Sequence, residues 1–210
     1  MFSYHRNSQK RIYDPKGMYF VTVVTHGRFP FFKERVFCEL MIEQIRLSKA
    51  IHGFQLFAWV IMHDHLHLLI QPTVGSNISR VMFSLKKQFS HDVNRIIGEN
   101  ETYYTKVGAQ TFARLLGGRD QSLQKYINNH QIIVDDLKFK FSQKTKRKTI
   151  DIPQFRWQKS YHDHLIRGEN DLKNHIAYIL KNPHAANYKD DWPYIHINAR
   201  FIDLTDPIDL

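Results

Sequence analysis

The sequence contains a single cysteine, Cys38, so no disulfide bond can form within the chain. Proteins without disulfide bonds are typical of reducing compartments. No apolar run reaches the roughly 18 residues that a membrane-spanning helix needs. The first residues, Met1 to Arg6, also lack the apolar core of a signal peptide. We therefore expect a cytoplasmic protein with no membrane partner.

Acidic residues are also scarce relative to basic ones. The 30 Lys and Arg against 20 Asp and Glu give a net charge of +10 with histidine neutral. This excess favours a polyanionic partner, because basic surfaces attract phosphate backbones. A basic protein without such a partner is the alternative. The 210 residues, 42% of them hydrophobic, suffice for one domain with a full core.

Two histidines open the second strand of a predicted hairpin. Residues 54–62 and 65–71 are apolar strands separated by a short polar break. Side chains alternate along a strand, so His65 and His67 share one face. Two imidazoles on one rigid face are good ligands for a divalent ion if a third group joins them. Alternatively, they are hydrogen-bonded polar residues of a sheet. The opposite face would carry the core residues Leu66, Leu68 and Ile70.

Three further elements surround this hairpin. Residues 18–25 are rich in β-branched and aromatic side chains and predict a strand, and residues 34–51 have helical spacing. Ser76-Asn77 predicts the cap of an amphipathic helix that begins at Ile78. Its polar face is either solvated or in contact with a nucleic-acid backbone. That face carries the cations Arg80, Lys86, Lys87, His91 and Arg95.

Residues 99–152 have the least regular pattern. We expect an insertion within a single domain spanning residues 1–210, with helical or mixed structure over 121–136. The cationic run from Lys138 to Lys148 contains no acidic residue. It is either a mobile solvated loop or, with Phe139 and Phe141 between the cations, a grip for single-stranded nucleic acid. Residues 192–210 are expected to form a tail packed over the domain.

A second His-x-His pair, His162 and His164, lies in a predicted strand over 161–167. Its middle residue is Asp163, which would point a carboxylate toward the core. This pair is therefore the weaker candidate for a metal site, although His164 can lie near the chemistry.

The helix that follows is predicted from Glu169 to about Lys181, where Pro183 stops it. Tyr178 and Asn182 are four residues apart, so they lie one turn from each other and can reach one point. Alternatively, Tyr178 is a packing aromatic and Asn182 merely ends the helix. The flank that carries both residues also includes Asp171 and His175, beside a buried stripe of Leu172, Ile176, Ile179 and Leu180.

Three motifs in this order resemble the HUH single-tyrosine transposases, in particular the REP-associated branch. His65-Leu66-His67 has the His-hydrophobe-His form of HUH endonucleases. Residues 157–167 resemble the family's Trp-Gln…Asp-His-x-Ile-Arg segment, and residues 178–183 resemble Tyr-Ile-x-x-Asn-Pro. The resemblance covers about residues 8–98 and 153–194.

The resemblance implies an α/β (α+β) fold, a ferredoxin-like sandwich with a central antiparallel sheet backed by helices. His65, His67 and Asn182 would hold Mg²⁺ or Mn²⁺, and Tyr178 would be the nucleophile. The substrate would be single-stranded DNA with hairpins, such as palindromic repeats, in the cytoplasm of a bacterium. The protein would act as a monomer or homodimer.

The implied chemistry agrees with the residue types. A cation on a non-bridging phosphate oxygen stabilises the charge that develops during attack. A tyrosine hydroxyl must lose its proton to attack well, and either His164 or a metal-bound water is the candidate base. Attack would join Tyr178 to the 5′ phosphate and free a 3′ hydroxyl, so that the reverse attack can rejoin strands.

The sequence departs from the family at Met62-His63-Asp64, where Met-Pro-Asn is common, so Asp64 or His63 can enter the metal site. Two other functions remain open. One is a different metal hydrolase built on residues 63–67. The other is a non-catalytic nucleic-acid-binding module of ferredoxin-like fold, such as a domesticated transposase.

Overall fold

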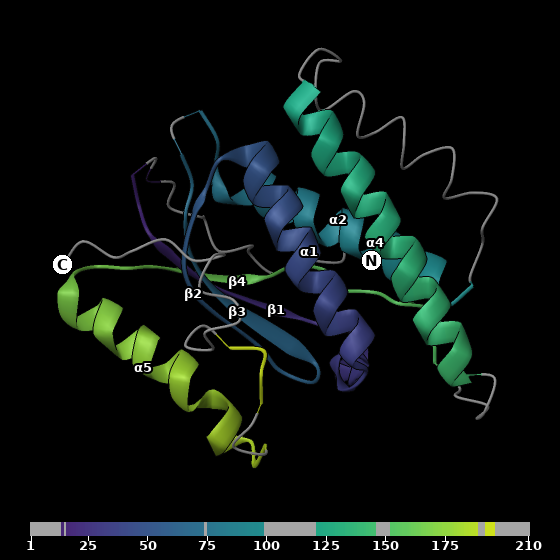
Figure 1. The fold of residues 1–210 in the computed structure, drawn as a ribbon. Helices are drawn as coiled ribbons and strands as arrows, with labels where there is room; N and C mark the ends of the chain where they lie inside the picture. Colours follow the sequence, from purple (N-terminus) through teal and green to yellow (C-terminus); the bar gives the residue numbers. More distant parts are fainter. Residues whose placement is uncertain are drawn as a thin grey trace, which may run out of the picture.

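The computed structural model of the chain describes residues 14, 16–73, 75–98, 121–145, 152–188 and 192–195. Four antiparallel strands form a sheet in the order β2-β3-β1-β4 (Figure 1). Their bounds are β1 Tyr19–Val24, β2 Gln55–Ile61, β3 His65–Gln71 and β4 His162–Leu165. β1 and β3 are therefore the central strands, as the buried apolar character of both predicts.

Helices cover both faces of this sheet. Helix α1 (Arg35–His52) connects β1 to β2, and α2 (Ile78–Ile96) follows β3. Together with α4 (Gln121–Thr145) they lie on one face, whereas α5 (Glu169–Ala185) lies on the other (Figure 1). Two short 3₁₀ turns, η1 (His26–Arg28) and η2 (Phe31–Lys33), precede α1. The order β1-α1-β2-β3-α2-β4 with this strand arrangement is the ferredoxin-like sandwich, so the predicted fold class is confirmed.

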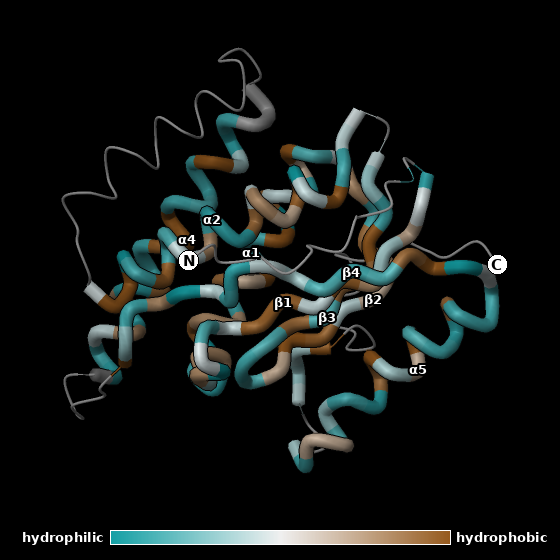
Figure 2. Tube along the Cα trace, turned by 180° about the vertical axis from the view of Figure 1, so that it is seen from behind, coloured by the Kyte–Doolittle hydropathy of each residue, from teal (hydrophilic) through white to brown (hydrophobic). Residues whose placement is uncertain are grey.

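Because side chains alternate along β3, this strand contributes to two hydrophobic cores of unequal size, one on each face of the sheet. The larger one lies between the sheet and α1, α2 and α4, and it contains the predicted residues Leu66, Leu68 and Ile70. The smaller one lies under α5, where Leu172 and Ile179 pack near Leu69. Figure 2 shows the hydrophobic positions gathered along the strands. The face with the smaller core leaves room for polar side chains, and it is the face that carries His65 and His67.

Helix bounds follow the predicted signals closely, with one correction. The Asn77 side chain accepts a hydrogen bond from the Arg80 backbone N–H (2.9 Å), which confirms the cap of α2. However, α5 does not stop before Pro183 but continues to Ala185. Proline forfeits only its own backbone bond there. The turn is held because Ala186 N–H still donates to Asn182 O (3.1 Å) and the Pro183 ring is buried.

The cationic run after Lys138 is not a loop in the part that the structure describes. It forms the last turns of α4 as far as Thr145, and residues 146–148 lie outside the described residues. The helix persists because one side of it is buried. Phe141 packs against Phe37 of α1, with ring centroids 5.4 Å apart, whereas Phe139 is exposed. Residues 99–120 of the expected insertion also lie outside the described part.

The beginning of the expected tail adds to the β2 edge of the sheet. Ile61 N–H donates to Tyr194 O (3.0 Å), and Ile195 bridges to Val60. The Trp192 indole donates to Ile61 O (2.8 Å). Residues 196–210 are outside the described part. Among the described helices, none has the length and apolar character to cross a bilayer.

Candidate active site

His67 lies in the middle of the sheet and is almost completely buried, with 3% of its surface exposed. Its Nδ1 is hydrogen-bonded to Thr22 Oγ1 of the neighbouring strand β1 (2.8 Å). Burial, together with the nearby His65, lowers the pKa of His67 to about 3. The ring is therefore neutral at physiological pH. Its Nε2 is buried and has no hydrogen-bond partner among the described residues.

His65 shares that face, as predicted, and its ring centroid is 4.8 Å from that of His67. Its Nδ1 is 2.6 Å from Asp64 Oδ1, and Arg28 holds the second oxygen of Asp64 (3.0 Å). Burial by itself raises the pKa of Asp64, but the hydrogen bonds from His65 and Arg28 lower it overall. The ionised carboxylate only accepts, so Nδ1 of His65 is the donor in this contact, and the neutral form of the ring has its lone pair on Nε2. Asp64 thus orients His65, a contact that the sequence does not reveal.

Tyr178 is carried to the histidine pair by α5. Its ring lies edge-on to His67, with centroids 5.2 Å apart, and 52% of its surface is exposed. Phe20 of β1 forms the floor between them, 5.1 Å from His67 and 5.8 Å from Tyr178. The Tyr178 ring is therefore exposed on one side and packs on Phe20 and His67 on the other. Phe20 has no signal in the sequence beyond belonging to a strand.

Asn182 lies one turn beyond Tyr178 on α5 and is half-buried. Beyond it, the Tyr188 hydroxyl accepts a hydrogen bond from the His63 backbone N–H (2.6 Å), and the two rings stack at 3.9 Å. The chain from Tyr178 to Tyr188 therefore runs from His67 toward the β2–β3 connection. His63 is thus packed against Tyr188, a contact that nothing in the local sequence indicates.

A second polar cluster adjoins this one at the β4 edge. His164 Nε2 is 2.8 Å from Asp171 Oδ2, and His175 Nδ1 is 3.1 Å from Asp171 Oδ1. The two imidazoles stack with centroids 4.7 Å apart, and His175 also contacts Phe20 at 4.6 Å. The hydrogen bond from His164 is the main cause that lowers the pKa of Asp171. The ligand atoms of the three residues lie within 4.8 Å of one another, close enough for a cation.

The structure therefore brings four predicted residues into one region. His65, His67, Tyr178 and His164 all lie on the α5 side of the sheet, linked through Phe20 and His175. His162, the partner of His164 in its motif, is exposed, and its ring has no hydrogen-bond partner among the described residues.

A ferredoxin-like sheet with a histidine pair and an exposed tyrosine on one face is the architecture of the HUH single-tyrosine transposases, a class of DNA-cleaving enzymes. The family model described as "Transposase IS200 like" matches residues 15–130, more than half of the chain. The chain belongs to this family. The match ends before Tyr178 and Asn182.

Individual relatives agree with this assignment. The chain is 24% identical over 195 residues to a protein from Haemophilus influenzae named as a REP-associated tyrosine transposase, covering 90% of this chain and 84% of the relative. It is also similar to the solved structure of a REP-associated tyrosine transposase bound to a REP hairpin. That likeness has a TM-score of 0.60 at 19% identity, over 98% of this chain and 91% of the other. The predicted transposase family is thus confirmed, and the Haemophilus influenzae relative carries the name of the predicted REP-associated branch.

Proposed function

We propose that this protein is a metal-dependent transposase that cuts and rejoins single-stranded DNA at hairpins, with Tyr178 as the nucleophile. The observation that carries the proposal is the contact between the exposed Tyr178 ring and the buried His67 ring. Because both residues belong to one chain, the contact supports a site completed within a single copy.

The donor set of the histidine pair fits a divalent ion. His67 Nε2 is a buried nitrogen without a hydrogen-bond partner among the described residues, and a cation would satisfy it. The other nitrogen of each ring is engaged, by Thr22 for His67 and by Asp64 for His65, which is the usual support of histidine ligands. When bound, Mg²⁺ or Mn²⁺ would supply charge neutralisation at the scissile phosphate.

Asn182 is proposed as the third protein ligand. The helix rises about 1.5 Å per residue, so Asn182 lies about 6 Å beyond Tyr178 along α5. His65 and His67 are about 7 Å apart along β3. The chain runs from Tyr178, which contacts His67, to Tyr188, which lies after the end of α5 and contacts His63. We therefore expect Asn182, which lies between them, to approach His65. A carboxamide oxygen is a suitable ligand for either ion.

His164 is proposed to handle the proton of Tyr178. Asp171 holds the His164 ring in stacking contact with His175, which precedes Tyr178 by one turn of α5. The imidazole can take the phenol proton as Tyr178 Oη attacks phosphorus. The bond to the 3′ oxygen then breaks, and that oxygen takes up a proton to become a hydroxyl. The 5′ phosphate stays on the tyrosine until the reverse attack.

The proposed substrate is single-stranded DNA with hairpins formed by palindromic repeats. The net charge of +10 supports a phosphate-rich partner. The solved structure with the same fold, a REP-associated transposase, holds a REP hairpin. A cytoplasmic location in a bacterium and a monomeric or homodimeric state belong to the same proposal.

The test is formation of a covalent adduct. The protein is mixed with end-labelled hairpin DNA carrying single-stranded flanks and Mn²⁺, then analysed on a denaturing gel. We expect a slow-migrating labelled band that EDTA and Tyr178→Phe abolish. Tyr126→Phe is the matched control, because Tyr126 on α4 has the same 52% exposure as Tyr178. Binding without any adduct, unaffected by EDTA, would instead indicate a non-catalytic DNA-binding module.

A further inference from the structure

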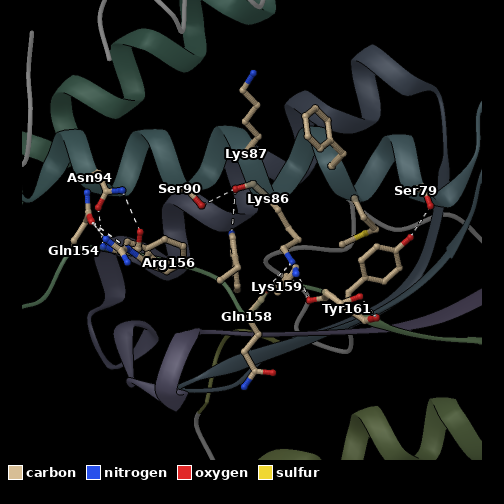
Figure 3. A pocket seen from close by; sticks show the side chains of 15 residues that line it. Ser79, Lys86, Lys87, Ser90, Asn94, Gln154, Arg156, Gln158, Lys159 and Tyr161 are labelled. Atoms are coloured by element: carbon tan, nitrogen blue, oxygen red, sulfur yellow. Dashed lines mark hydrogen bonds between the residues drawn. The ribbon is translucent and has the colours of Figure 1, made fainter. Parts of the chain in front are cut away.

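A groove lies on the side of the sheet away from Tyr178. It is a cavity of about 900 Å³ between α2 and the segment 154–161 that leads into β4 (Figure 3). Trp157 forms part of its wall, and its indole donates a hydrogen bond to Lys86 O (3.1 Å). Lys86 in turn donates from Nζ to the Gln158 and Ser160 carbonyls, each at 2.9 Å. These bonds tie the segment to α2, so the groove is a built feature of the fold.

The charge of the groove is of one sign. Its lining includes Lys86, Lys87, Arg156 and Lys159, and no Asp or Glu is among the lining residues. Arg156 hydrogen-bonds to the neutral Gln154 carboxamide (2.7 Å). Lys87, Arg156 and Lys159 have no carboxylate partner among the described residues. Several such cations around one cavity favour an anionic ligand.

The groove also has an aromatic platform. Phe83 of α2 is 67% exposed, the most exposed of the large hydrophobic side chains in the described part. Lys87 Nζ lies over this ring, 5.8 Å from its centre, so a cation and an exposed aromatic side chain occupy the same part of the surface. Single exposed apolar residues are common and need no explanation. Phe83 differs because it lines a cationic cavity, and an aromatic ring beside cations is how proteins hold unpaired bases.

We propose that this groove binds a single-stranded DNA segment, with a base stacked on Phe83 and phosphates on Lys87, Arg156 and Lys159. The inference rests on the proposed function for the identity of the substrate. The segment 154–161 continues directly into β4, whose His164 lies on the Tyr178 side of the sheet. A strand held in the groove can therefore pass over the β4 edge to the cleavage site. The groove would hold the DNA that flanks the cut.

The test separates binding from cleavage. Binding is measured by fluorescence anisotropy in EDTA, in a Tyr178→Phe background, so no chemistry contributes. The probes are one DNA hairpin with a single-stranded extension and the same hairpin without it. We expect the extension to tighten binding, and Phe83→Ala to weaken binding of the extended probe about tenfold while leaving the blunt hairpin unaffected. Lys87→Ala with Lys159→Ala should reduce the salt slope of log K by about 0.7 for each phosphate that is no longer neutralised.

Two matched controls come from α4. Phe139 is 62% exposed and flanked by Lys138 and Lys140, so Phe139→Ala removes a comparable aromatic from a different cationic surface. Lys125→Ala removes an exposed cation far from the groove in sequence. Both variants should bind the extended probe like the parent protein. All of the substituted side chains are exposed, so these variants should fold.

The proposal would be overturned if Phe83→Ala bound both probes like the parent, or if Phe139→Ala carried the loss instead. Tighter binding of RNA of the same sequence would overturn the assignment to DNA. Failure of the groove proposal can be distinguished from failure of the proposed function. If Tyr178→Phe leaves an adduct intact while Phe83→Ala still weakens the extended probe, the groove stands and the nucleophile is wrong.

Discussion

The sheet carries two His-x-His pairs on the same face, and the two pairs differ in exposure. His67 on the central strand β3 and His162 on the edge strand β4 both lie beside Thr22 of β1. His67 is 3% exposed, whereas His162 is exposed and the side chain of His164 is 42% exposed. The same spacing therefore gives a buried, neutral His67 in the central strand, whereas both histidines of the edge-strand pair are more exposed.

The two pairs also differ in the hydrogen-bond partners of their ring nitrogens. On β3, Thr22 and Asp64 engage the Nδ1 atoms, so the two Nε2 atoms remain for a ligand. On β4, the Nε2 of His164 is already engaged by Asp171. A histidine motif therefore acquires its chemistry from the strand it occupies and from the atoms that neighbouring elements supply.

The largest expected effect comes from replacing one histidine of each pair by alanine and comparing the two variants. His67→Ala should reduce the rate of adduct formation about a thousandfold or more, because it removes a proposed ligand and several kcal/mol of charge stabilisation. His162→Ala should stay within about twofold of the unmodified protein. Single-turnover assays with labelled hairpin DNA and Mn²⁺ measure both. Equal losses in the two variants would contradict the separation of the pairs.

The next largest effect distinguishes the two carboxylates that contact these histidines, Asp64 and Asp171. Asp64→Asn should weaken Mn²⁺ binding about 10- to 100-fold, as is typical when the group that orients a histidine ligand is lost. Asp171→Asn should slow adduct formation without changing Mn²⁺ affinity, because it positions His164 and His175. Calorimetric titration of the DNA-free protein measures the affinity. If Asp171→Asn alone greatly weakened Mn²⁺ binding, the ion would instead be bound by the cluster of His164, Asp171 and His175.

Sequence reasoning captured the local part of this site and missed the long-range part. Strand alternation fixed the shared face of His65 and His67, and helical spacing aligned Tyr178 with Asn182. These relations span at most a few residues. The contacts of Phe20 with His67 and of Tyr188 with His63 join residues 47 and 125 positions apart. No local pattern encodes such pairs, because they depend on the register of β1 against β3 and on where the chain after α5 meets the sheet.

The same division applies to the fold. The caps and periodicity of α2 sufficed to predict its start, and the family motifs pointed to the ferredoxin-like order of strands. The extent of α4 was not predictable, because a cationic sequence after Lys138 resembles a loop until Phe141 is known to pack on Phe37. Pro183 was misleading for the same reason, since burial of its ring holds the last turn of α5 together.

The buried state of His67 also predicts how stability depends on pH in the metal-free protein. Its pKa is about 3 in the fold, against 6.5 for a free histidine. Between these values the unfolded chain binds a proton that the folded chain does not, so this residue lowers stability as pH falls from 6.5 toward 3. The slope from one such group is about 1.4 kcal/mol per pH unit.

Replacing His67 should therefore flatten the acid side of the stability curve. In EDTA, His67→Gln should lose less unfolding free energy between pH 6.5 and 5 than the unmodified protein, by up to about 2 kcal/mol. His162→Gln removes an exposed imidazole and should leave the difference unchanged. Urea unfolding at the two pH values, followed by tryptophan fluorescence, measures the change. Parallel curves for all three proteins would show that His67 takes up a proton in the folded state.

The smallest expected effect tests whether Thr22 selects the proton position on His67. Thr22→Val keeps the shape of the side chain but removes the hydroxyl that contacts Nδ1 at 2.8 Å. One neutral hydrogen bond is worth about 0.5 to 1.5 kcal/mol, so Mn²⁺ affinity should fall about two- to tenfold. Thr22→Ser retains a hydroxyl and should restore most of that affinity. If valine and serine behaved alike, the strand position of His67 alone would prepare it for a ligand, and the difference between the two pairs would rest on burial more than on their partners.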